Sequence, residues 1–159
     1  MSGLRSELLR TLEARGFIHQ CTDLAALDAA ALAGPITAYV GYDLTADSLH
    51  IGHLVSIMML RHLQRTGHRP IALAGGGTTK VGDPSGKDES RQLLTQEQID
   101  ANKRGIEASL ARFLDFGTGG ATLVDNDEWL SGLGYIPFLR DFGTHFTINR
   151  MLTFDSVKL

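Results

Sequence analysis

Two short apolar segments on either side of one long amphipathic segment constrain the fold of this chain most. Residues 36–42 and 70–74 are rich in aliphatic and aromatic residues, a pattern typical of buried strands. Between them, residues 51–66 carry apolar side chains at helical spacing. A strand, a helix and a second strand in this order form a βαβ unit with parallel strands and a right-handed crossover. The sequence therefore predicts an α/β fold with a twisted parallel sheet and helices on both faces.

The segments around this unit predict further helices and one more strand. Apolar periodicity favours helices over residues 4–16 and 23–32. Thr95 and Gln98 have the spacing of a capping box, which predicts a helix from there to about Phe116. Residues 122–124 favour a short third strand.

Glycine and acidic runs mark two other segments. Gly75, Gly76 and Gly77 open a predicted long loop that runs through residue 86. The acidic run at 125–128 is interpreted as the cap of a following helix. From Trp129 onward the pattern is mostly helical and rich in aromatic residues.

Length and composition narrow the possible functions. The 159 residues suit one domain, and a net charge of −3 gives no electrostatic argument for nucleic acid or an anionic membrane. Cys21 is the single cysteine, which excludes an intrachain disulfide and a thiolate metal cluster. No apolar run approaches the ~20 residues that span a bilayer, so no membrane partner is expected. Because the N-terminus carries charges where a signal peptide is apolar, we expect a cytoplasmic protein.

Unusual polar residues gather in the loops that follow the first two strands. Ligands bind at the carboxyl ends of parallel strands, and residues 43–53 and 75–87 both lie there. The right-handed crossover puts the two loops on one edge of the sheet. Tyr39, on the first strand, either packs in the core or places its hydroxyl in a pocket.

The first loop ends in His50-Ile51-Gly52-His53, at a predicted helix start. Free backbone N–H groups and the helix dipole attract anions there, and residues three apart share one helix face. Gly52 removes the side chain between the histidines, so a phosphate or purine could approach the backbone. Nucleotide binding is one interpretation. A metal site with Asp47 as third ligand, or two histidines that only cap and pack, are the alternatives.

The second loop matches neither of two common phosphate-binding motifs. Asp83 stands where a Walker loop requires lysine, and Lys80 replaces the third glycine of the dinucleotide fingerprint. Lys87 and Arg91 are four residues apart, so on a helix they reach one phosphate group together. A solvated charged loop is the alternative.

The residues quoted so far resemble a known family. Residues 39–53, YVGYDLTADSLHIGH, are similar to the first signature of bacterial tyrosyl-tRNA synthetases. Residues 67–77 and 82–87 resemble the loop that follows in that family, and residues 137–146 resemble its connecting, dimer-forming segment. The HIGH motif is shared by all class I synthetases and some nucleotidyltransferases. The tyrosine at position 39 together with the 82–87 loop is more specific.

The resemblance implies an incomplete Rossmann-like parallel sheet with a helical connecting segment. Residues 1–127 would form the N-terminal part of the catalytic domain, and residues 128–159 the start of the connecting, dimer-interface segment. The family chain is much longer, so the resemblance implies an N-terminal fragment that holds about half of one active site. We do not expect such a fragment to aminoacylate alone. A homodimer and tRNA(Tyr) are the expected partners.

The resemblance also implies the reaction and its residues. L-tyrosine would be activated with ATP to tyrosyl-adenylate and transferred to tRNA(Tyr), with Mg²⁺ accompanying ATP and no bound prosthetic group or metal-ligand set. The residues expected to bind tyrosine are Tyr39, Leu73, Thr78 and Asp83. The residues expected to act in catalysis are Thr45, His50, His53, Lys87 and Arg91. The residues expected to bind ATP are Gly41, Asp43, His50, Gly52 and His53.

Within that set, the resemblance gives each group a task. Tyr39 would contact the substrate phenol and Asp83 the substrate ammonium. Thr45 and His50 would bind the γ-phosphate side of the transition state, and His53 the ribose region. Lys87 and Arg91 would stabilise the leaving pyrophosphate. The Gly77–Lys80 run departs from the Ala-Thr-Gly-hydrophobic run that is usual in the family.

Three other functions stay open at this point. A tryptophan–tRNA ligase shares the fold, and another class I nucleotidyltransferase would use the same histidine pair. A non-catalytic dimerisation or RNA-binding module is the third. Tyr39 and the 82–87 loop favour tyrosine as the substrate.

Overall fold

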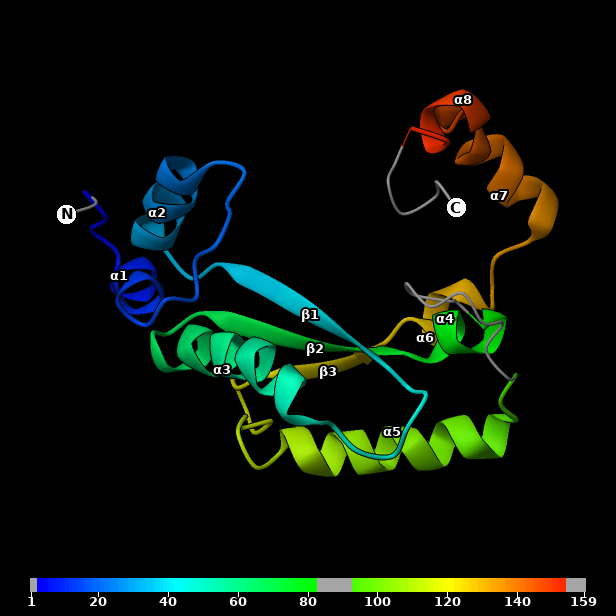
Figure 1. Ribbon diagram of the computed structural model, residues 1–159, viewed down its shortest axis with the longest axis horizontal. Coiled ribbons are helices and arrows are strands. Elements are labelled where there is room, and N and C mark those ends of the chain that lie inside the picture. Colours follow the sequence, from blue (N-terminus) through cyan, green and yellow to red (C-terminus); the bar gives the residue numbers. More distant parts are fainter. Residues whose placement is uncertain (1–2, 83–92, 154–159) are drawn as a thin grey trace.

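A parallel sheet organises the protein, whose computed structural model describes residues 3–82 and 93–153. Within these ranges the strands are β1 (Thr37–Asp43), β2 (Arg69–Gly75) and β3 (Thr122–Asp125), in the order β1-β2-β3. Tyr39 pairs with Ile71, and Ile71 pairs with Thr122. The predicted α/β fold with a parallel sheet is therefore confirmed (Figure 1).

Helices α3 (Ile51–Arg65) and α5 (Gln96–Leu110) cover one face of this sheet (Figure 1). Alternate strand residues point toward them, because successive side chains of a strand face opposite sides. The core under these helices combines strand and helix residues, namely Tyr42, Ala72, Ala74, Ile57, Leu60, Ile99, Ile106 and Leu110. The apolar periodicity of both helices is explained by this burial.

The opposite face of the sheet is largely open. Tyr39, Ile71, Leu73 and Val124 lie on it, and 67% of Tyr39 is exposed. The short helix α6 (Asp127–Leu130) reaches this face through Trp129. The face that carries Tyr39 is therefore less covered by helices than the face under α3 and α5. Sequence periodicity gives the two faces of a strand but not what covers each one.

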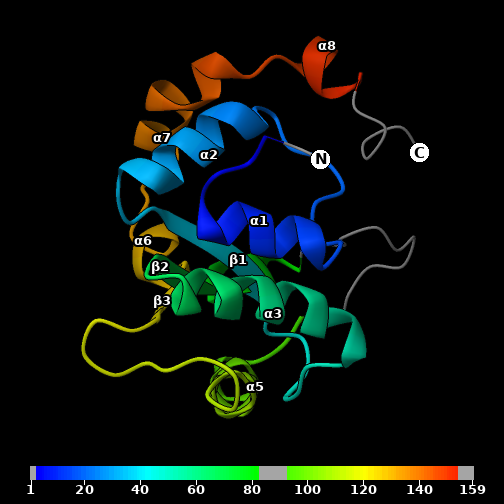
Figure 2. The same ribbon diagram turned by 90° about the vertical axis from the view of Figure 1, so that its left-hand side faces the viewer.

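Helices α1 (Glu7–Ala14) and α2 (Leu24–Ala33) form an N-terminal hairpin beside α3 (Figure 2). Leucines of α1 pack against Leu63 in a second apolar cluster. The Asp28 carboxylate of α2 accepts hydrogen bonds from the Ser6 hydroxyl at 2.6 Å and from the Ser6 N–H at 2.9 Å. These bonds hold the pKa of Asp28 below its usual value and tie α2 to the start of α1.

Two element boundaries differ from the prediction. A helix, α4 (Gly76–Val81), forms where a loop was predicted, because Asp125 and Asn126 accept the N–H groups of its first turn. Helix α5 begins at the predicted capping box but ends at Leu110 rather than near Phe116. After Leu110, the Arg61 guanidinium of α3 donates a hydrogen bond to the Phe113 carbonyl. This bond holds residues 111–113 in turns instead of a continued helix.

The last described residues are helical and exposed. They form α7 (Tyr135–Asp141), a 3₁₀ turn (Gly143–His145) and α8 (Ile148–Met151), as the aromatic periodicity predicted. Their large apolar side chains, among them Phe138 and Phe142, are mostly accessible to solvent. In residues 3–82 and 93–153, no helix is both long and apolar enough to cross a membrane.

Candidate active site

The histidine pair begins α3 at the carboxyl edge of the sheet. The rings of His50 and His53 lie with their centroids 3.9 Å apart, so both share one helix face as predicted. Nδ1 of His50 accepts the Gly52 N–H at 3.0 Å, and Nδ1 of His53 accepts the His50 N–H at 3.2 Å. The two side chains therefore form a reciprocal capping box.

These bonds use Nδ1 of each ring, so a ligand at this helix start would meet the Nε2 atoms. Because Nδ1 accepts a hydrogen bond in each ring, the proton of each neutral imidazole is on Nε2. Two Nε2–H donors at a helix N-terminus suit the oxygens of a phosphate. Capping and ligand binding are thus compatible, since they use different nitrogens of the same rings.

Gly52 has a structural reason in this conformation. A Cβ at this position would lie 2.8 Å from Cε1 of His50, closer than side-chain contacts allow. The space beside Gly52 is therefore occupied by the His50 ring, whereas the sequence suggested an approach path for a phosphate or purine. Glycine allows the capping imidazole to lie against the first helical turn.

The metal-site alternative lacks a third ligand in the part of the chain that the structure describes. There, no three or more His, Cys, Asp or Glu side chains are grouped so that they could hold an ion. The Asp47 carboxylate instead accepts the Ser48 hydroxyl at 3.2 Å. No protein ligand set for Mg²⁺ is therefore assigned among these residues.

A second feature lies on the open face of the sheet. Tyr39, Leu73 and Trp129 line a cavity of about 280 Å³ together with Ile71 and Val124. This is near the lower limit of the ~300–1,000 Å³ common for ligand pockets. The exposed ring of Tyr39 excludes the interpretation that this residue only fills the core. The lining is apolar, and Tyr39 is the one lining residue that carries a hydroxyl.

The strand register shows where the other candidate residues of β1 and of the segment after it lie. Gly41 pairs with Leu73 and so lies on the open face, next to the cavity residues. Asp43 ends β1, and Thr45 is exposed in the connection from β1 to α3. Strand β1 therefore presents Tyr39 on its open face and leads to the histidines at its carboxyl end.

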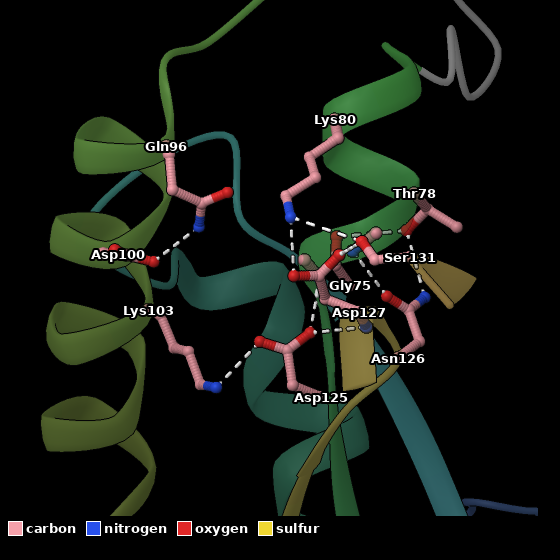
Figure 3. Close-up of polar contacts among 12 residues, drawn as sticks. Gly75, Thr78, Lys80, Gln96, Asp100, Lys103, Asp125, Asn126, Asp127 and Ser131 are labelled. Atoms are coloured by element: carbon pink, nitrogen blue, oxygen red, sulfur yellow. Dashed lines mark hydrogen bonds and ion pairs between the residues drawn. The ribbon is translucent and has the colours of Figure 1, made fainter. Parts of the chain in front are cut away.

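The predicted tyrosine contact Thr78 lies on α4, outside this cavity. Its hydroxyl donates to the Gly75 carbonyl at 3.1 Å and accepts from Nδ2 of Asn126 at 3.3 Å (Figure 3). It lines a different cavity of about 710 Å³, between α4 and the residues that lead into α7. Asp83, Lys87 and Arg91 lie outside the described residues.

A polar network joins the ends of β2 and β3 (Figure 3). The buried Asp125 carboxylate accepts the Gly76 N–H at 3.0 Å and pairs with Nζ of Lys103 at 2.7 Å. Asn126 accepts the Gly77 N–H at 2.8 Å. These three contacts attach α4 and α5 to the end of β3.

Lys80 and Asp127 extend this network. Nζ of Lys80 lies 2.6 Å from the Asp127 carboxylate, and this bond holds the pKa of Asp127 below its usual value. The unusual residue in the Gly77–Lys80 run thus has a structural partner on α6. The acidic run caps α6 as predicted, since Asp125 accepts the Asp127 N–H, but it also caps α4.

Sequence reasoning missed the roles of Asp125, Asn126 and Trp129. Asp125 and Asn126 follow a buried strand directly, which is the position where polar residues meet at a sheet edge. That signal could have brought them into the candidate site. Trp129 carried no signal beyond its aromatic ring, because its cavity forms only when β3 lies beside β2.

Comparisons with known proteins agree with these features. A model of the family described as tRNA synthetases class I (W and Y) matches residues 31–159. The tyrosine–tRNA ligase of Xanthobacter autotrophicus is 68% identical over 98% of this chain and 37% of its own length. That of Rhodospirillum rubrum is 60% identical over 100% of this chain and 38% of its own length. The chain thus spans less than two-fifths of these relatives.

A solved structure has the same arrangement. The C-terminally truncated mitochondrial tyrosyl-tRNA synthetase of Aspergillus nidulans matches with a TM-score of 0.82 at 30% identity. The match covers 98% of this chain and 47% of that one. The parallel sheet, the histidine pair at the start of α3 and the family match together identify the chain as a member of the class I tRNA synthetases of the tryptophan and tyrosine group.

Proposed function

We propose that the chain carries tyrosine and ATP contacts of a tyrosine–tRNA ligase. The observation that carries this proposal is the layout of β1. Tyr39 faces an apolar cavity, and about four residues further along the strand the chain reaches the segment before the histidine pair. At ~3.3 Å per residue, these four residues place the end of β1 roughly 13 Å from Tyr39. This leaves room for a tyrosine between a phenol contact and a phosphate contact.

The proposed reaction needs no covalent enzyme intermediate. A carboxylate oxygen of tyrosine attacks the α-phosphorus of ATP, and the bond from that phosphorus to the pyrophosphate oxygen breaks. Catalysis is then positioning of the reactants and stabilisation of charge on the leaving group. A hydroxyl of tRNA(Tyr) subsequently attacks the acyl carbon of tyrosyl-adenylate, an ester bond forms, and AMP leaves.

Each side chain has a proposed task in this step. Tyr39 bonds the substrate phenol and Leu73 packs on its ring, while Thr78, on α4 outside the Tyr39 cavity, and Asp83 are proposed to contact other parts of the tyrosine. The residues proposed for the nucleotide are Gly41, Asp43, His50 and His53, and Gly52 serves this site by letting the His50 ring lie against the helix start. Nε2–H of His50 donates to the phosphates together with the Thr45 hydroxyl, and Lys87 and Arg91 neutralise the pyrophosphate.

Selection against phenylalanine follows from the same pocket. A site that bonds a phenol leaves its own polar group unpaired when phenylalanine enters, which raises the barrier for the wrong substrate. Mg²⁺ is proposed to accompany ATP as part of the substrate.

The remaining features belong to the same proposal. Residues 1–127 form the N-terminal part of a Rossmann-like catalytic domain, and 128–159 begin a helical segment that contributes to a homodimer. The protein acts in the cytoplasm. Support for these points comes from the high identity to tyrosine–tRNA ligases and from the exposed apolar side chains of α7 and α8.

Tyrosine-dependent exchange of pyrophosphate into ATP tests the proposed function. The gene product is assayed as the cell makes it, with tyrosine, tryptophan and phenylalanine offered separately. We expect exchange with tyrosine only. Exchange with tryptophan would instead support a tryptophan–tRNA ligase, and turnover that needs no amino acid would support another nucleotidyltransferase.

Two variants assign the roles. Tyr39→Phe is expected to raise KM for tyrosine by about 10-fold or more, because the phenol of the bound substrate loses its hydrogen-bond partner, with a small effect on kcat. His50→Ala is expected to lower kcat by about 10²-fold with KM for tyrosine unchanged, as for loss of a transition-state donor. The reverse assignment of effects would contradict the proposed layout.

A further inference from the structure

Hydrogen bonds to the backbone of Leu44 anchor the connection from β1 to α3. Leu44 is fully buried, while Thr45 and Asp47 on the same segment are exposed. The Leu44 N–H donates to the Thr79 hydroxyl at 3.1 Å. Its carbonyl accepts a hydrogen bond from Nδ2 of Asn102 at 2.8 Å. Both backbone groups of the residue before Thr45 are therefore fixed by side chains from other helices.

Helix α5 contacts this segment at a second point. A Cβ at Gly105 would overlap the Asp47 carbonyl oxygen, so the backbones of α5 and of this segment meet there. Glycine in a helix interior is less stable than alanine and therefore needs a structural reason. The close approach of Asp47 explains why α5 has glycine at this position.

Asn102 and Gly105 are three residues apart and so lie on one face of α5. The apolar face of the same helix packs in the core through Ile99, Ile106 and Leu110. Asn102 and Gly105 instead meet backbone atoms of segment 44–47, one on each side of Thr45. They define where the Thr45 backbone lies relative to the start of α3.

We propose that Asn102 and Gly105 are positioning residues that set the Thr45 hydroxyl against the phosphates of ATP by fixing the backbone of residues 44–47. The inference rests on the proposed function, in which Thr45 acts with His50 on the phosphates. Neither residue belongs to the first signature or to the glycine loop. Their effect is confined to the nucleotide side, because the Tyr39 cavity lies on the opposite face of the sheet from α5.

Substitutions on α5 test this inference in the full gene product. Asn102→Asp keeps the shape of the side chain but replaces the donor with an oxygen. Gly105→Ala adds the methyl group that overlaps Asp47. Arg104→Ala and Glu107→Ala, at exposed positions on the same helix, are the controls. The readouts are kcat and the KM values for tyrosine and ATP in pyrophosphate exchange, with the thermal midpoint measured for each variant.

We expect Asn102→Asp to lower kcat by about 10- to 100-fold, since small misplacements of a catalytic group cost up to ~10²-fold. KM for tyrosine should stay within about 2-fold, and both controls should match the unmodified protein. A general loss of structure would change both KM values and the thermal midpoint together. That pattern, or an unchanged kcat, would overturn the inference. If Gly105→Ala does not fold, Asn102→Asp alone decides.

A double-mutant cycle with Thr45→Ala tests the route of the effect. If Asn102 acts through Thr45, the double variant loses less than the product of the two single losses. Multiplicative losses would show that Asn102 acts elsewhere and would reject the inference. Failure of this inference is distinct from failure of the proposed function, because the latter appears as absent exchange in the unmodified protein.

Discussion

His62 places a titratable ring inside the apolar contact between α1 and α3. Only 4% of it is exposed, its Nε2 has no hydrogen-bond partner among the described residues, and it meets Phe17 edge-on. Burial lowers the pKa of His62, and the positive charges of Arg15, Arg65 and Arg61 lower it further. Burial also lowers the pKa of His68, whose Nδ1 accepts the Ile36 N–H.

These shifts predict acid sensitivity in a defined window. With folded pKa values below the unfolded value of roughly 6.5, the unfolded state binds protons first as pH falls. The free energy of unfolding should therefore be constant above about pH 7 and decrease from about pH 6.5 downward. Urea denaturation across this range measures it. His62→Leu, which cannot titrate, should flatten the decrease without weakening the protein at pH 7.5.

Two comparisons make this pH prediction specific. His19→Gln, at an exposed position, should leave the profile unchanged. Asp28 has a lowered pKa, so its contribution persists down to about pH 4 and disappears below it, outside the histidine window. A His62→Leu profile identical to that of the unmodified protein would reject the assignment to His62.

The start of α4 depends on residues 49 positions away in the sequence. Gly76 and Gly77 have low helix propensity, and their N–H groups are capped by Asp125 and Asn126 instead of a local side chain. Asp125 also pairs with Lys103 of α5. One buried carboxylate therefore joins the β2–α4 connection, α5 and the end of β3.

Asp125→Ala should consequently destabilise the protein strongly. Removing one partner of a buried ion pair costs about 3–5 kcal/mol, and partial exposure of Lys103 reduces this to on the order of 2–4 kcal/mol. Urea denaturation at pH 7.5 measures the change. Asp141→Ala breaks an exposed pair with Arg140 and should change stability by less than about 0.5 kcal/mol. Equal effects of the two substitutions would contradict the role of Asp125.

These elements also show what could be predicted from the sequence. The three strands and α3 were predictable because apolar runs and helical spacing are local signals, and the capping box of Thr95 located the start of α5. The histidine pair was predictable for the same reason. Helix α4 was not, because its caps come from β3. The end of α5 was not, because Arg61 of α3 binds the segment after it.

In the candidate site, too, some contacts were predictable from the sequence and others were not. Tyr39 and His50 belong to one contiguous run of residues, so the βαβ order was enough to predict that β1 leads from Tyr39 to the histidine pair. The cavity beside Tyr39 needs Trp129, and the position of Thr45 needs Asn102. Both partners are distant in sequence and become neighbours only through the order of the strands and the path of α5.

The described chain leaves two apolar surfaces exposed, the open sheet face and the helical segment 133–152. Large apolar side chains on the segment include Tyr135, Ile136, Phe138, Phe142 and Ile148. Phe138 and Phe142 lie with ring centroids 5.6 Å apart on α7. Contiguous exposed apolar surfaces of this kind mark sites of association. We therefore expect the segment to drive self-association of the gene product into a dimer.

Sedimentation equilibrium measures this association. Removing an aromatic anchor from an interface costs about 2 kcal/mol, which corresponds to a roughly 30-fold weaker dimer. Phe138→Ser and Phe142→Ser should each raise the dimer Kd by about that factor, because each leaves its partner surface without an aromatic contact. Val55→Ser, at an exposed apolar position on α3, should leave Kd unchanged. A monomeric unmodified protein, or equal effects at all three positions, would show that the dimer does not form through α7.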